Sequence, residues 1–156
     1  MDYHVIIEPS GSEKIEFATS ANDGASNDSA VQGDIQSFRF KMNSLNDDAL
    51  ERDQHARCEM RLEGEINDHT REKTGKLADW AMRVKNLYAT VTVEVIAFND
   101  STTGTTLRSY VFDKMFCVDY EEIYADNGTE KGSDTGQFKL FMAQGPHYTK
   151  RIIVSV

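Results

Sequence analysis

Hydrophobic and polar residues alternate along most of the chain with a period of two. This period is typical of β-strands that bury one face and expose the other. The clearest example is Cys58–Ile66, in which apolar residues alternate with three glutamates and one arginine. Weaker alternation predicts further strands at residues 3–7, 15–17, 38–42, 138–142 and 152–156.

Two longer apolar segments predict strands in the middle of the sheet. Ala89–Phe98 is β-branched and apolar on both faces, so we expect a central strand that is covered at least partly on both sides. Thr105–Tyr124 is extended throughout. It is long enough for two strands joined at a bend, or for one strand that passes through a bulge near Asp113 and Lys114.

One segment, Gly75–Lys85, predicts an amphipathic helix. Thr74 is the expected N-cap, because its hydroxyl can accept a hydrogen bond from an early backbone N–H. Arg83 and Lys85 are expected in the last turn, where cations interact favourably with the helix dipole. The apolar stripe falls at i, i+3, i+4 and i+7 and consists of Leu77, Trp80, Ala81 and Val84. We expect the single tryptophan to anchor this helix to a sheet.

Two strongly polar stretches, residues 18–34 and 43–57, predict long excursions from the strands. Loops of this length are uncommon in a compact domain unless they have a function. Together the elements predict a mainly β fold in one domain, residues 1–156. About eight or nine short strands and one helix favour a small β-barrel with the helix packed outside it.

Composition excludes several partners. The chain has 156 residues and a formal net charge of −9, which argues against nucleic acid and against an anionic membrane surface. The longest apolar stretches, such as Val91–Phe98 and Ile152–Val156, are too short to span a bilayer, so we expect no membrane insertion. The first residues lack the basic and apolar regions of a signal peptide, so we expect a cytoplasmic protein. Cys58 and Cys117 are therefore expected to be reduced, with a disulfide between them as the lesser alternative.

No sequence motif points to catalysis. The four histidines include no HExxH pair, and there is no G-x-S-x-G or phosphate-binding glycine pattern. We expect no catalytic residues, no metal and no cofactor. A hydrolase whose site is assembled only in space has no feature in its favour. Abundant strand without chemistry favours a binding or assembly protein rather than an enzyme.

The order of the elements from Phe38 to Val156 resembles the Hcp-like tube proteins (TssD group) of type VI secretion and related contractile injection systems. The most specific segment is Tyr110–Tyr124 (YVFDKMFCVDYEEIY), which looks like that family's aromatic-rich strand pair. The other matching segments are Ser37–Met42, Leu50–Arg57, Cys58–Ile66, Gly75–Lys85, Val91–Phe98, Gln137–Ala143 and Lys150–Val156.

The resemblance implies a β-barrel subunit that forms hexameric rings, which stack into a hollow tube driven by a contracting sheath. It also implies sheath, baseplate or spike proteins and effector cargo as partners, with no cofactor. Such a tube assembles in the cytoplasm, and its secretion on firing needs no signal peptide. The alternative is a soluble β-sandwich that binds carbohydrate or peptide through exposed aromatic residues such as Tyr88, Tyr110 or Tyr148.

The second polar excursion is the candidate subunit interface. Its mixed charges would set the register of assembly and make assembly sensitive to salt. A mobile loop in solvent is the competing interpretation. The candidate residues are Asp47, Asp48, Glu51, Arg52 and Asp53.

Reversal of one charge tests this interface. If Arg52 contacts a neighbouring subunit, Arg52→Glu should weaken ring or tube formation, because it places an acid where a base was matched. Sedimentation velocity of the variant and the wild type measures the effect. Unchanged assembly would remove the excursion from the interface.

Overall fold

In a computed structural model of the chain, the described residues form eight strands and one helix. The structure describes residues 1–19, 33–44, 56–97, 104–125, 136–145 and 152–156. In chain order the elements are β1 (Asp2–Pro9), β2 (Ile15–Phe17), β3 (Ile35–Ser44), β4 (Ala56–Ile66), α2 (Arg71–Ala81), β5 (Ala89–Ala97), β6 (Thr105–Tyr124), β7 (Gly136–Gln144) and β8 (Ile152–Ser155).

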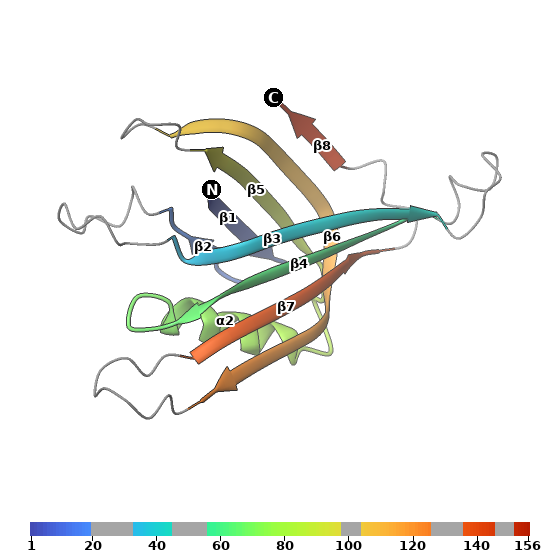
Figure 1. Cartoon of the computed structure of the whole chain (residues 1–156). Helices are drawn as coiled ribbons and strands as arrows, with labels where there is room; N and C mark the ends of the chain where they lie inside the picture. The colour runs from blue at the N-terminus through green and yellow to red at the C-terminus, as the bar shows by residue number, and fades with distance from the viewer. Residues whose placement is uncertain (20–32, 45–55, 98–103, 126–135, 146–151) are drawn as a thin grey trace.

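All the strands belong to one antiparallel sheet. Its order is β2-β1-β5-β6-β7-β4-β3, and β8 pairs with β6 beside this path. The sheet curls, so that β3, β4 and β7 lie in front of β1 and β5 in Figure 1 and β3 comes against β1. The strand count and the mainly β barrel predicted from the alternating pattern are confirmed.

The long strand β6 connects the two sides of the curled sheet. It pairs with β5 up to Met115 and with β7 from Met115 onward. Just before Met115, Asp113 and Lys114 lie opposite the single residue Thr90 of β5, and Lys114 has a φ of 56°. The Asp113 carboxylate accepts the backbone N–H of Lys114 at 2.9 Å. One strand therefore passes through a bulge at the expected position, where bulges bend strands and increase their twist.

Asp34 holds the two ends of the sheet together. Its backbone N–H donates to the carbonyl of Ala18 at 3.1 Å, and its carboxylate accepts the Ala18 N–H at 2.8 Å. The same carboxylate accepts a hydrogen bond from the Lys73 ammonium on α2 at 2.6 Å. The Asp34 side chain is only 5% exposed, so its charge needs these partners. We call this contact between the end of β2, the start of β3 and α2 the seam.

The core lies inside the curled sheet and under α2. It is built from the inward positions of the alternating strands, together with Leu77 and Trp80 from the helix. Trp80 is buried and donates its indole N–H to the carbonyl of Leu87 at 3.2 Å, so the expected anchor is confirmed. The largest fully buried strand residues are Phe17, Phe112, Phe138, Ile7, Met60, Leu62, Met115, Leu140, Met142 and Val5.

The helix begins four residues earlier than predicted. Thr70, not Thr74, is the N-cap, and Thr74 lies inside the helix with its hydroxyl donating to the Thr70 carbonyl at 2.9 Å. The cause is a turn at Asn67, whose side chain accepts the backbone N–H of His69 at 2.9 Å and that of Thr70 at 3.1 Å. Because this turn presets the first backbone hydrogen bonds, the helix starts at Arg71.

The predicted end of the helix is wrong as well. The helix stops at Ala81, and Arg83 and Lys85 follow it, so its last turn carries no basic residue. Val84, placed on the apolar stripe by periodicity, is 88% exposed. The chain must leave the helix early to reach β5, and Asn86 supplies a positive φ of 53° in that connection.

The expectations for β5 and for the cysteines are largely met. β5 is central in the sheet, with one face buried and the other half-buried. Cys58 and Cys117 are both free, so the disulfide alternative is excluded. Within the described residues, no helix combines the length and apolar character needed to cross a lipid bilayer.

Two glycine substitutions test the packing with opposite expected signs. A Cβ on Gly64 would lie 2.5 Å from the Asp34 carbonyl and 2.6 Å from the Phe138 ring, so Gly64→Ala should destabilise the fold by about 1–3 kcal/mol through overpacking. Gly75, on the exposed side of α2, has nothing within 4 Å of that position. Gly75→Ala should stabilise by about 0.5–1 kcal/mol through helix propensity. Urea denaturation measures both, and equal effects would contradict the packing at Gly64.

Candidate assembly surface

The five residues predicted as the interface lie outside the described residues. Asp47, Asp48, Glu51, Arg52 and Asp53 all fall between β3 and β4, within residues 45–55. Their role stays a prediction. The described part of the chain offers a different surface, which begins at the two strands that flank this segment.

Four strand segments form one wall of the barrel. In order they are β3, β4, β7 and the second half of β6 (residues 119–124), and we call them the front sheet. Inward positions such as Leu62 and Leu140 are buried in the core. The opposite face carries no further layer of described strand or helix (Figure 1). One face of the front sheet is buried and the other is exposed, which explains why apolar and polar residues alternate along its strands.

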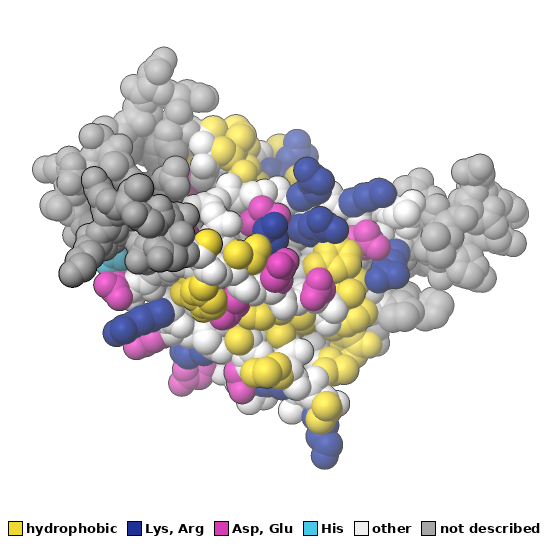
Figure 2. Space-filling model, turned by 60° about the horizontal axis from the view of Figure 1, so that its bottom comes forward, with side chains coloured by type: hydrophobic (Ala, Val, Ile, Leu, Met, Phe, Trp, Pro, Cys, Tyr) yellow, Lys and Arg dark blue, Asp and Glu magenta, His cyan; other side chains and the backbone are white. Residues whose placement is uncertain are grey.

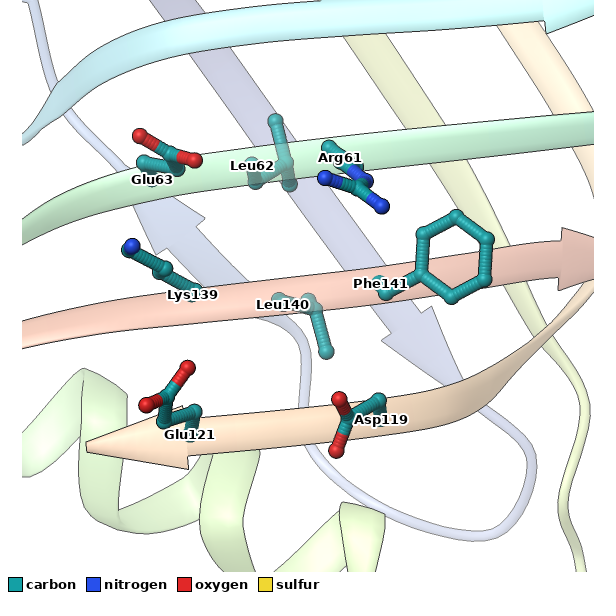
Figure 3. A pocket seen from close by; sticks show the side chains of 8 residues that line it. All are labelled: Arg61, Leu62, Glu63, Asp119, Glu121, Lys139, Leu140 and Phe141. Carbon is teal, nitrogen blue, oxygen red and sulfur yellow. The ribbon is translucent and has the colours of Figure 1, made fainter.

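The open face carries rows of charge that run across the strands. One row places Lys139 between Glu63 and Glu121, and the next places Phe141 between Arg61 and Asp119. In Figure 3 all six side chains project from the same side of the sheet, over a shallow pocket that also touches Leu62 and Leu140. The Arg61 guanidinium lies 5.1 Å from the centre of the Phe141 ring, a favourable cation–π contact.

The charges change sign from one margin of the front sheet to the other. On β3, Arg39 and Lys41 share the open face with Arg61 and Glu59. On β6, the open-face positions at the opposite margin are Asp119 and Glu121. These four marginal charges are exposed. Ion pairs within 4 Å among the described residues include none of them.

Both margins are also unpaired strand edges. Of the described strands, β3 pairs only with β4, and the second half of β6 pairs only with β7. Their outer N–H and C=O groups therefore have no partner strand, which is the usual template for pairing with another chain. Figure 1 shows these two edges at the upper and lower limits of the front sheet. The front sheet thus ends in a basic edge at one margin and an acidic edge at the other.

The described residues offer no metal site and no activated cysteine. On the face that Figure 2 turns forward, acidic, basic and hydrophobic side chains are interspersed. The described residues contain no group of three or more His, Cys, Asp or Glu that could hold a metal ion. Burial raises the pKa of both Cys58 and Cys117 to about 11, with a smaller contribution from the neighbouring acids, so neither thiol is activated as a nucleophile.

A tyrosine–glutamate cluster lies near the end of β6 and serves the packing of α2. The Tyr120 hydroxyl lies 2.7 Å from the Glu122 carboxylate and 3.3 Å from the Thr74 carbonyl, and the Tyr124 hydroxyl lies 2.6 Å from the same carboxylate. Burial and then the hydrogen bond to Glu122 raise the pKa of Tyr120. The hydrogen bond to Glu122 also raises the pKa of Tyr124, so both phenols stay protonated and donate to this carboxylate.

Two of the three aromatic residues named for the binding-module alternative pack against other rings. Tyr110 packs against Phe40, with ring centres 4.8 Å apart, and against Phe112. Tyr88 packs edge-on to Phe116 at 6.2 Å. Tyr148 lies outside the described residues. The two described rings thus serve packing, as buried aromatic pairs usually do.

The two charged edges were not predicted from the sequence. Each pair, Arg39 with Lys41 and Asp119 with Glu121, is visible in the sequence as two like charges two residues apart on a strand. That spacing places both charges of a pair on one face. It does not say that the two strands lie at opposite margins of one sheet, because the order of the strands depends on contacts between distant segments.

Comparison with known proteins gives no match by sequence but clear matches of fold. No family model and no curated protein sequence matches the chain. A crystal structure of an Hcp protein superposes with a TM-score of 0.60 at 13% identity, covering 99% of this chain and 98% of that one. Hcp1 from the E. coli EAEC 042 pathovar gives 0.56 at 7% identity, covering 100% and 99%.

A chain of a baseplate structure has the same fold. A chain of the anti-feeding prophage (AFP) baseplate, a structure with six-fold symmetry, superposes with a TM-score of 0.54 at 9% identity. The match covers 98% of this chain and 91% of that one. Identities this low establish the fold. The chain therefore has the Hcp-like fold that its order of elements resembles.

Proposed function

We propose that this chain is a structural subunit of the inner tube of a contractile injection machine, of the type VI secretion or phage-tail type. Copies join into six-membered rings, and the rings stack into a tube. The likeness to Hcp proteins and to the AFP baseplate chain supports this role. The role is structural and requires no catalytic group, metal or cofactor.

The observation that carries the proposal is the pair of unlike edges on the front sheet. The sheet has four strand segments, all antiparallel. Because four is even, the β6 edge of one copy runs antiparallel to the β3 edge of a second copy in the same orientation. Addition can therefore repeat by rotation alone, which is a head-to-tail contact of the kind that closes rings.

The charges at the edges favour this pairing and disfavour others. Antiparallel pairing that places Arg39 beside Glu121 also places Lys41 beside Asp119, because both pairs are spaced by two residues. Side chains opposite each other on one face have Cβ atoms about 5 Å apart, and unlike charges there stabilise while like charges destabilise. Backbone hydrogen bonds would supply most of the affinity, and the charges would set partner and register.

The polar excursions would then act between rings rather than within them. Asp47, Asp48, Glu51, Arg52 and Asp53 remain the proposed contacts for stacking, since they leave the front sheet between β3 and β4. Sheath, baseplate or spike proteins and effector cargo are the proposed partners of the assembled tube. The assembled tube is proposed to lie in the cytoplasm and to leave the cell on firing.

Two complementary double variants test the pairing of edges. Arg39→Glu with Lys41→Glu makes both edges acidic, and Asp119→Lys with Glu121→Lys makes both edges basic. Each protein alone should fail to form rings, because like charges would then meet at every junction. Mixed in equal amounts, the two should form rings in which they alternate, which an even-membered ring permits. Native mass spectrometry gives the composition, and negative-stain microscopy shows the rings.

A matched control reverses two lysines away from both edges. Lys76→Glu with Lys85→Glu changes the charge as much as the first variant, and its rings should match the wild type in number and size. Rings from either edge variant alone, or no rescue on mixing, would place the junction elsewhere. Wild-type protein that stays monomeric at every concentration and salt level would count against the tube role itself.

A further inference from the structure

A histidine outside the front sheet connects three strands on the other side of the barrel. His4 lies on the outer face of β1, between β2 and β5. Its Nδ1 is 2.9 Å from a carboxylate oxygen of Glu94 on β5, and its Nε2 is 2.8 Å from one of Glu16 on β2. The two carboxylates bind opposite sides of the ring and do not converge, so this is not a metal site.

This geometry specifies the protonation state of the ring. An ionised carboxylate only accepts hydrogen bonds, whereas a neutral imidazole has one N–H and one lone pair. A neutral His4 could therefore donate to one glutamate only and would turn its lone pair toward the other. Both short contacts are satisfied together only when His4 is the doubly protonated imidazolium.

The surroundings favour that charged form. Partial burial by itself would lower the pKa of His4, but the hydrogen bonds and charges of Glu94 and Glu16 outweigh it and raise the pKa above its ordinary value. The His4 side chain is 20% exposed and each glutamate is 40% exposed, so solvent screens the pairs only in part. Lys14 also lies 3.0 Å from Glu16, and Asp2 shares the outer face of β1 with His4.

We propose that protonated His4 is a clasp that holds the short edge strand β2 on the barrel, and that the clasp opens when His4 loses its proton. β2 has only three residues in register with β1, whereas β5 has eight. A neutral His4 can donate a hydrogen bond to only one of the two carboxylates. Since β2 is held to β1 by fewer residues than β5, we expect β2 to be the strand that moves away. Glu16 also keeps Lys14 as an alternative partner, while no such cation contacts Glu94 among the described ion pairs.

The clasp is close enough to the seam to affect it. Glu16 lies two residues before Ala18, which exchanges two hydrogen bonds with Asp34. Loosening β2 would therefore weaken the contact between the first part of the sheet and β3. This inference concerns the subunit itself and does not depend on ring formation, since neither edge of the front sheet is involved.

The sign of the pH effect follows from the direction of the shifts. The pKa of His4 is raised, so its contribution to stability is complete below the ordinary histidine value near 6.5 and is lost as the pH rises through the folded-state pKa. The hydrogen bond from His4, and then that from Lys14, lowers the pKa of Glu16. The contribution of Glu16 is present above its ordinary value near 4.5 and is lost as the pH falls through the lowered one. The clasp is therefore closed at pH values between the lowered pKa of Glu16 and the raised pKa of His4.

Titration of His4 by NMR tests the protonation state. With ¹⁵N-labelled imidazoles, His4 should titrate above pH 6.5 in the wild type and show two protonated nitrogens below that pKa. Glu16→Gln and Glu94→Gln should each lower this pKa, because each removes one charged acceptor. The other three histidines serve as references within the same sample. A His4 that titrates at or below 6.5, or that ignores both substitutions, would overturn the proposal.

Hydrogen exchange tests the mechanical consequence. Protection factors of the β2 amides, corrected for intrinsic exchange, should fall in the wild type as the pH rises through the pKa of His4. The protection factors should fall by at most tenfold for each pH unit by which the pKa of His4 in the folded protein exceeds its pKa in the unfolded chain. In His4→Gln and in Glu16→Gln the protection should not depend on this pH range, and the amides of β4 and β7 should be unaffected in all three proteins. Parallel profiles for β2 in the wild type and both variants would refute the clasp.

Discussion

The closed shape of this barrel depends on the contact between Asp34 and Ala18. Elsewhere, strands next to each other in space share several backbone hydrogen bonds, but the two ends of the sheet meet through this short seam. An ionised carboxylate inside the protein is costly unless it is paired, so Asp34 brings Lys73 of α2 to the same point. The helix is thereby tied to the place where the sheet closes, and its apolar face covers the core from that side.

Closure at the seam and the bulge in β6 together create the front sheet. β6 bends at the bulge at Asp113 and Lys114, and from Met115 onward it extends the wall made by β7, β4 and β3. Its pairing with β5 ends at Met115, because β5 begins at Ala89. The acidic residues in the second half of β6 therefore lie on an edge that the proposed assembly uses.

The strands were predictable because the alternation of apolar and polar residues within each strand shows which of its faces is buried. Alternation between Cys58 and Ile66 identifies a half-buried strand without reference to other segments. The extended segment Thr105–Tyr124 allowed either two strands joined at a bend or one strand with a bulge near Asp113 and Lys114, and the structure has the bulge. The helix start was missed because a side-chain turn at Asn67 outweighed the better-looking cap at Thr74. The seam could not be predicted, since Ala18 and Asp34 meet only when the whole sheet has curled. The pairing of a basic edge with an acidic edge could not be predicted either, because only the order of the strands places these charges at opposite margins of one sheet.

The parity of the front sheet has a consequence for any cylinder made from it. Four antiparallel segments allow every copy to stand the same way up, whereas three or five would force each neighbour to be inverted. All the helices α2 would then point in one direction, and the two mouths of the cylinder would display different loops. Such a cylinder is polar, because its two ends differ. Growth could start at one end and be capped at the other. The orientation of the fold in a single subunit would then determine the direction in which the cylinder moves.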